Sequence, residues 1–130
     1  MASVVEPDFM KGPRTPLEGL SSSSDARALA NQRFPEKPYC LVRDWTIFRT
    51  EVTRDELFKC HAAGQLPMIL FAHNVAEDSQ GRFERGDWAR SSMCTGFHDG
   101  VAFETRNTVY VLIGPGHEQL ASLKDVFSLF

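Results

Sequence analysis

The sequence YCLVRDWTIFR, residues 39–49, is rich in aromatic and β-branched side chains. Such side chains pack well on a pleated surface, so the stretch predicts a β-strand. A second run, MILFAHNV at residues 68–75, is mostly apolar and predicts a strand that is covered on both faces over part of its length. The two runs together predict a β-sheet as part of the fold.

Further strands are predicted towards the C-terminus. Trp88–Phe97 resumes the strand pattern, and Asp99-Gly100 follows it as a strong hairpin signal, because both positions of a two-residue turn need positive φ. With that turn, Gly96 would face Phe103 across the hairpin. Thr108–Ile113 is one more apolar segment with strand character. These strands are expected to pair antiparallel.

Three segments carry helix signals. Ala26–Arg33 follows a run of serines that can cap a helix, and Thr53 with Glu56 three residues later forms a capping box. Gly64 supplies the left-handed position that ends this second helix. In the tail, His117–Phe130 places apolar residues near helical spacing and predicts a short amphipathic helix.

Two segments are expected to lie outside regular structure. Residues 1–20 contain three prolines and show no hydrophobic period, which predicts an irregular N-terminal arm. Gly114-Pro115-Gly116 is expected to end the sheet. Residues 21–130 then form a single domain, the default for a chain of 130 residues. The expected fold class is α+β: an antiparallel meander of four to five strands with two or three short helices.

The composition argues against a nucleic-acid partner. The net charge is −3 at pH 7, and basic residues alternate with acidic ones, as in Arg43-Asp44 and Arg82-Phe83-Glu84-Arg85. A nucleic-acid binder needs clustered Lys and Arg to displace the counterions that surround the phosphates. The charge pattern indicates a mixed, solvated surface instead.

Cysteine usage and hydropathy predict a cytoplasmic protein. The three cysteines, Cys40, Cys60 and Cys94, are scattered and form neither a disulfide framework nor a CxxC pair. The first residues lack the pattern of a signal peptide. The longest apolar run, Met68–Ala72, is far shorter than the roughly 20 residues that span a bilayer. We therefore expect free thiols, a reducing compartment and no membrane association.

No motif for catalysis or metal binding stands out. None of the four histidines is spaced from a second His or Cys as metal sites require, so neither a metal nor another cofactor is expected. Cys94, Ser91 and Ser92 lack the neighbouring base or the GxSxG context of a nucleophile. Triad chemistry is therefore disfavoured.

The most suggestive polar residues lie around a predicted turn or bulge. Glu104, Arg106 and Asn107 place a carboxylate, a guanidinium and an amide close together, and His73 is expected on a neighbouring strand. Together they would form a polar pocket, which makes a small enzyme or ligand-binding domain the alternative hypothesis. The simpler interpretation, which we favour, makes Glu104 and Arg106 the solvent side of a strand.

Four aromatic residues are candidate anchors for a protein partner: Trp45, Trp88, Phe127 and Phe130. Aromatic side chains dominate interface energetics, although in a small domain tryptophans more often fill the core. The apolar tail must dock somewhere, because a free apolar end invites aggregation. Two outcomes are open: the tail docks on the chain's own body, or it docks on a second copy and makes a homodimer.

Three segments carry a resemblance to a known family: CLVRDW (40–45), GDWARSS (86–92) and FETRNTVYVLIGPG (103–116). They resemble short uncharacterised bacterial proteins that often occur in prophage-like neighbourhoods. That family has no assigned activity, so the resemblance assigns no role to any residue. It implies a context in which small accessory proteins of mobile elements bind and block a host protein.

Three functions are therefore weighed. The leading hypothesis is a protein-interaction module that acts as an inhibitor or regulator, supported by the mixed-charge surface and the aromatic candidates. The enzyme or ligand-binding hypothesis would need a concave site around His73 and Glu104. A purely structural, self-associating protein is the third.

Overall fold

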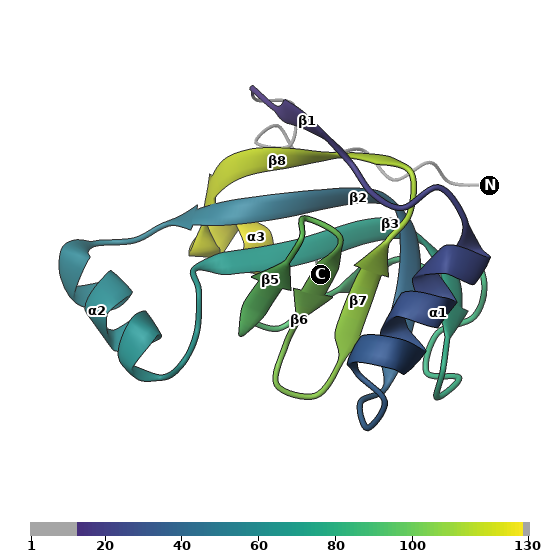
Figure 1. The fold of residues 1–130 in the computed structure, drawn as a ribbon. Coiled ribbons are helices and arrows are strands. Elements are labelled where there is room, and N and C mark those ends of the chain that lie inside the picture. The colour runs from purple at the N-terminus through teal and green to yellow at the C-terminus, as the bar shows by residue number, and fades with distance from the viewer. Residues whose placement is uncertain (1–12, 129–130) are drawn as a thin grey trace.

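A computed structural model of the protein describes residues 13–128. These residues form eight strands and three helices (Figure 1). The strands are β1 (Thr15–Glu18), β2 (Tyr39–Glu51), β3 (Met68–Asp78), β4 (Ala89–Arg90), β5 (Gly96–His98), β6 (Ala102–Glu104), β7 (Val109–Leu112) and β8 (Pro115–Ser122). The helices are α1 (Ser23–Arg33), α2 (Arg54–Ala62) and α3 (Leu123–Phe127).

The sheet is built on β2. This strand is 13 residues long, and β3 pairs with it antiparallel along one edge. Along its other edge two strands pair in parallel, one after the other: β7 beside Tyr39–Val42 and β8 beside Trp45–Glu51. The sheet therefore divides between Val42 and Trp45 into two branches, β7–β6–β5 and β8–β1.

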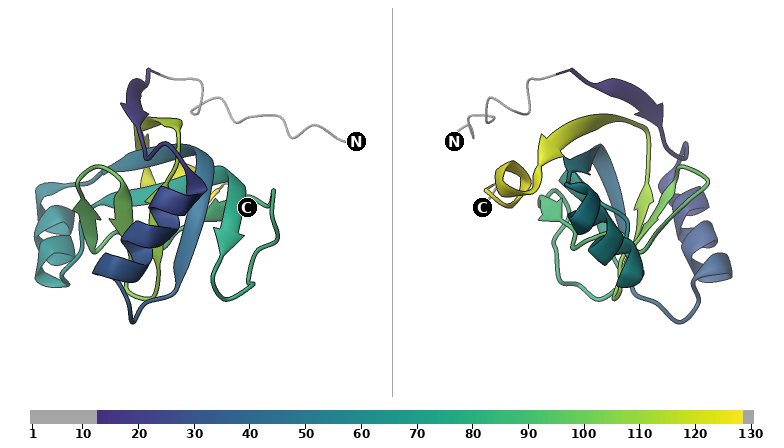
Figure 2. Two further views of the ribbon diagram at one scale, coloured as in Figure 1. Left: turned by 45° about the vertical axis from the view of Figure 1, so that its right-hand side comes forward. Right: turned by 90° about the vertical axis from the view of Figure 1, so that its left-hand side faces the viewer.

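The sheet curls into a half-barrel, which Figure 2 shows from two sides. The amide of Cys94 donates to the carbonyl of Met68 at 3.0 Å. The amide of Thr95, the next residue, donates to the carbonyl of Glu104 at 2.7 Å. These two bonds carry the chain from the edge of β3 to the β5–β6 hairpin and so bring the far ends of the sheet together.

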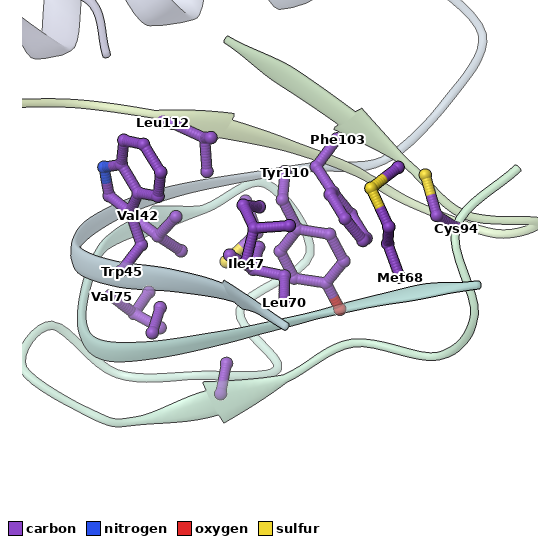
Figure 3. Packing of buried hydrophobic residues seen from close by; sticks show 13 residues of the cluster. Val42, Trp45, Ile47, Met68, Leu70, Val75, Cys94, Phe103, Tyr110 and Leu112 are labelled. Atoms are coloured by element: carbon purple, nitrogen blue, oxygen red, sulfur yellow. The ribbon is translucent and has the colours of Figure 1, made fainter. Parts of the chain in front are cut away.

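The half-barrel encloses the main core. Its buried side chains come from β2, β3 and the β6–β7 branch, and Figure 3 draws them. They include Val42, Trp45, Ile47, Met68, Leu70, Phe103, Tyr110 and Leu112. Trp45 lies at one end of this cluster, and Met68, Cys94 and Phe103 lie at the other. One tryptophan, a candidate interaction anchor, is therefore a core residue.

The helices begin at their capping residues. The amide of Asp25 donates to the side chain of Ser22 at the start of α1. At α2 the side chains of Thr53 and Glu56 each accept from the other's backbone amide, so the predicted capping box is present. Helix α1 packs on β7, whereas α2 has no buried residue and projects at the left of Figure 1.

The predicted antiparallel meander of four to five strands is wrong. The described residues form one mixed sheet of eight strands, and β2 pairs in parallel with both β7 and β8. These parallel neighbours are far from β2 in the sequence, so the pattern within each segment does not reveal them. Gly114-Pro115-Gly116 does not end the sheet either. Gly114, with a φ of 71°, turns the chain from β7 into β8.

The predicted tail helix is shorter than expected, because the first part of the tail is a strand. β8 occupies its first part, and only α3 is helical. Leu120, which helical spacing would bury, is 63% exposed, because pairing with β2 sets which side chains of β8 face inwards. Of the segment 1–20, expected to be irregular, residues 1–12 lie outside the described residues, and the remainder contains β1, which pairs antiparallel with β8. Of the expected strand Trp88–Phe97, only β4 and the start of β5 are strand.

The Asp99-Gly100 turn forms, but its register differs from the prediction. Both residues have positive φ, 52° and 70°, and the amide of Val101 donates to the carbonyl of His98 at 3.0 Å. The carbonyl of Val101, however, accepts from the amide of Leu112 on β7 at 2.9 Å. His98 consequently pairs with Ala102, and the pairing along the hairpin moves by one residue, so Gly96 faces Glu104 instead of Phe103.

Candidate functional site

The candidate site lies on the side of β2, β3 and β8 that points away from the main core, which we call the outer face. Side chains alternate along a strand, so Thr46 and Phe48 of β2 lie on this face, and Phe71 of β3 is paired with Thr46. Helix α3 covers part of the face, where Val126 is buried against Phe48 and Phe71. Further along β3, His73 is exposed.

Five side chains form what we call the outer aromatic patch: His73, Phe71, Trp88, Arg90 and Phe127. The ring of Phe71 stacks on Trp88, with 5.9 Å between centroids, and meets His73 edge-on at 4.8 Å. Arg90 of β4 is paired with Phe71, and its guanidinium carbon lies 4.7 Å from the centroid of the Phe127 ring. Trp88 and Phe127 are 48% and 47% exposed. Two half-exposed aromatic rings thus gather around Phe71 and Arg90.

Arg90 is the permanent charge of the patch. Burial lowers its pKa, because the neighbouring side chains exclude part of the water that solvates the guanidinium. The guanidinium is still protonated at neutral pH and is attracted to the electron-rich face of the Phe127 ring.

A second feature, which we call the histidine hollow, lies beside the patch. It has a volume of about 240 Å³ and is lined by Arg14, Asp44, Trp45, Thr46, His73, Pro115, Gly116 and His117. His73 belongs to both features, and His117 of β8 is paired with Thr46 of β2. Asp44 has a φ of 51°, a conformation that is uncommon for a residue with a side chain. The hollow therefore combines two imidazoles, a carboxylate and a guanidinium.

The candidate anchors fall in different places. Trp45 is 1% exposed and its indole nitrogen donates to the carbonyl of Ile113 at 3.3 Å, so it is a core side chain. Trp88 and Phe127 come together in the outer aromatic patch. Phe130 lies outside the described residues. Two of the four candidates therefore share one surface.

The residues of the predicted polar site lie on different elements. Glu104 accepts from Lys37 Nζ at 2.6 Å and lies 2.9 Å from His98 Nε2. Burial alone would raise the pKa of Glu104, but the bonds from Lys37 and His98 outweigh it and lower the pKa. Arg106 and Asn107 are exposed at the tip of the turn between β6 and β7. His73 is on β3, and β2 and β7 separate it from β6 in the sheet.

Another hollow, of about 640 Å³, lies between α2 and the ends of β2 and β3. Its lining is largely apolar and comprises Arg49, Thr50, Glu51, Val52, Leu57, His61, Leu66, Pro67 and Met68. Phe58 of α2 is 75% exposed. This hollow gathers fewer groups able to bind or transfer protons than the histidine hollow, so we do not place the candidate site there.

Two kinds of feature are absent from residues 13–128. No group of three or more His, Cys, Asp or Glu side chains in this range can hold a metal ion, and this includes the histidine hollow. No helix in the same range is long enough and apolar enough to cross a membrane.

Sequence reasoning missed Phe71, Arg90, Asp44 and His117. A signal for one of them was present, because strand alternation in residues 68–75 places Phe71 and His73 on the same face. No comparable signal links Arg90 to Phe127 or His117 to His73, because β4 is distant from α3 in the sequence and β3 is distant from β8.

A comparison with protein families supplies the chain's relationships. Residues 18–128 match the model of a family described as "Domain of unknown function (DUF6957)", so the chain belongs to this family. No curated protein and no solved structure matches the chain.

Proposed function

We propose that this member of the DUF6957 family is a protein-interaction module whose binding surface is the outer aromatic patch. One observation carries the proposal: Trp88 and Phe127, both about half exposed, gather with Phe71 and Arg90 on a single face. Tryptophan and arginine are enriched among the residues that dominate binding free energies. Burying two such rings on a partner removes apolar surface from water, which is the main driving force of association.

The chemistry of the patch indicates what the partner presents. Its rings fit an apolar or aromatic side chain of the partner, and the Arg90 guanidinium, which lies over the Phe127 ring, adds a positive charge to the patch. We expect the partner to contribute an apolar or aromatic side chain to this surface.

The biological role in this proposal is that of an inhibitor or regulator. It rests on the resemblance to small bacterial proteins of prophage-like neighbourhoods, which suggests a host protein as the target. The three free cysteines, two of them buried, fit a cytoplasmic setting in which thiols stay reduced.

The test compares variants that remove a ring from the patch with one that removes a ring elsewhere. Tagged wild-type protein, Trp88→Ala, Phe127→Ala and Phe58→Ala are used for capture from a bacterial lysate, and the captured partner is then purified. Phe58 is the matched control because it is an exposed aromatic on α2, outside the patch. Titration calorimetry measures the dissociation constant of each variant for the purified partner.

We expect Trp88→Ala and Phe127→Ala each to weaken binding by at least about tenfold, which corresponds to about 1.4 kcal/mol. Phe58→Ala should bind like the wild type. Capture alone does not support the proposal. Equal losses in all three variants, or wild-type affinity of Trp88→Ala, would show that the patch is not the binding surface.

A further inference from the structure

The histidine hollow is independent of the proposed interaction surface in its chemistry. Four elements converge on it: the residue before β1, the bend of β2 at Asp44, the middle of β3 and the start of β8. Thr46, 3% exposed, is one of its lining residues, and the cross-strand pairing sets His117 directly beside Thr46. On the other side of β2, Phe71 of β3 pairs with Thr46, and His73 lies two residues further along β3. Two imidazoles therefore approach one buried threonine from the two strands that flank it.

The backbone at Asp44 contributes to the shape of the hollow. A φ of 51° is costly for a residue with a side chain, and such conformations concentrate at binding and catalytic sites. In the ladder, Arg43 pairs with Asn74 and Trp45 pairs with Ala72, so Asp44 and His73 each lie between these two registered pairs. The carboxylate and one imidazole of the hollow therefore come from the same stretch of two neighbouring strands.

Size and chemistry limit the ligand. A volume of about 240 Å³ holds about eight non-hydrogen atoms, taking roughly 30 Å³ for each as for a water molecule. The imidazoles of His73 and His117 can donate hydrogen bonds to a carboxylate. Asp44 would repel a simple anion, but it accepts a hydrogen bond from a ligand that also carries a hydroxyl or amino group.

We propose that the histidine hollow binds a small hydroxy- or amino-carboxylic acid. His73 and His117 hold its carboxylate, and Asp44 holds its hydroxyl or amino group. Asp44 provides the selectivity. An acid that has no hydroxyl or amino group cannot donate a hydrogen bond to Asp44, so its own carboxylate only repels the Asp44 carboxylate. The proposal does not depend on the outer aromatic patch having a protein partner, although His73 is common to both features.

The test follows the imidazole Cε1–H signals of the four histidines by NMR, each assigned by a His→Gln variant. The probes are lactate and alanine, with propionate as an acid that lacks the donor and lactamide as an analogue that lacks the carboxylate. We expect lactate or alanine to shift the His73 and His117 signals saturably. The His61 and His98 signals serve as internal controls and should stay in place, since neither lines the hollow.

Two variants identify the roles. His117→Gln should weaken binding of the responding probe at least tenfold. Asp44→Asn keeps the hydrogen-bonding shape and suits a left-handed backbone, so it should fold and should reduce the discrimination between lactate and propionate. Trp88→Ala should bind the probe like the wild type, which separates this proposal from the interaction surface.

Three results would overturn the proposal. The first is an equal shift of all four histidine signals, and the second is a linear shift that does not saturate at roughly a 50-fold molar excess of probe over protein. The third is equal binding of lactamide and lactate. The first two indicate a general ionic effect, and the third shows that the carboxylate is not what the hollow recognises. A variant that does not fold is recognised by the loss of signal dispersion in its NMR spectrum. In that case the titration of the wild-type protein with the four probes tests the proposal.

Discussion

Gly116 of β8 lies directly against the indole of Trp45, the residue with which it pairs on β2. A Cβ atom on Gly116 would overlap the Cδ2, Cε2 and Cε3 atoms of the ring. The indole cannot easily withdraw, because it is 1% exposed and its nitrogen is bonded to the carbonyl of Ile113. This contact lies where the sheet divides into its two branches, so the absence of a side chain at position 116 is part of what permits the fold.

Gly116→Ala should therefore destabilise the protein by about 1–3 kcal/mol, the usual cost of overpacking a core. Urea denaturation followed by tryptophan fluorescence measures the change. Gly96→Ala is the matched control: its Cβ would lie 2.8 Å from His98 Nε2, at the end of a partly exposed side chain that can shift at the expense of its contact with Glu104. The control should lose less stability than Gly116→Ala, and the reverse order would refute the assigned role of the Trp45 contact.

Lowering the pH should reduce the free energy of unfolding partly because Glu77 becomes protonated. The bond from Arg27, and then the bond from Tyr39, lower the pKa of Glu77 from 4.5 to about 2. Because the folded-state pKa is the lower one, the stabilisation is present above pH 4.5 and is lost as the pH falls from there through about 2. Glu77→Gln should flatten this part of the stability profile in urea denaturation between pH 6 and about 2. An unchanged slope would exclude Glu77 as a contributor.

The three cysteines should differ in reactivity. Burial raises the pKa of Cys40 to about 12 and that of Cys94 to about 11, and both side chains are 0% exposed. Cys60 on α2 is partly exposed. Because the thiolate is the reactive form, a disulfide reagent such as DTNB should modify Cys60 first in the native protein at pH 8, and all three in urea. Rapid native modification of Cys40 or Cys94 would contradict the described core.

Asp78 should hold the loop between β3 and β4 in its folded conformation. Its carboxylate, fully buried as a side chain, accepts from the amide of Arg82 at 2.6 Å and from its guanidinium at 2.7 Å. Asp78→Ala removes the acceptor of these charge-assisted bonds and should cost about 1.5–3 kcal/mol. Hydrogen exchange at the amides of residues 82–87 should accelerate. Asp55→Ala, an exposed position on α2, is the control and should leave this exchange unchanged.

Part of the candidate site could be predicted from the sequence. Trp88 and Phe127 are recognisable as candidates because aromatic side chains are enriched at interfaces and because the apolar tail must dock somewhere. What unites them is not recognisable: Phe71 and Arg90 meet only through the pairing of β3 with β4, and Phe127 reaches Arg90 only through the docking of α3. The predicted site at Glu104 failed to include His73 because the parallel pairing of β2 with β7 separates their strands.

Local chemistry was sufficient for the capping box at Thr53 and Glu56, for the strands around Tyr39–Arg49 and Met68–Val75, and for the turn at Asp99-Gly100. Each depends on residues within a few positions of one another. Tertiary structure alone decided that β7 and β8 share one edge of β2, that the first part of the tail becomes a strand, and that Asp44, His73 and His117 line one hollow. The reason is that strand pairing satisfies backbone donors and acceptors across long sequence separations. The room available for side chains, such as that of Trp45 against Gly116, then selects among the remaining pairings.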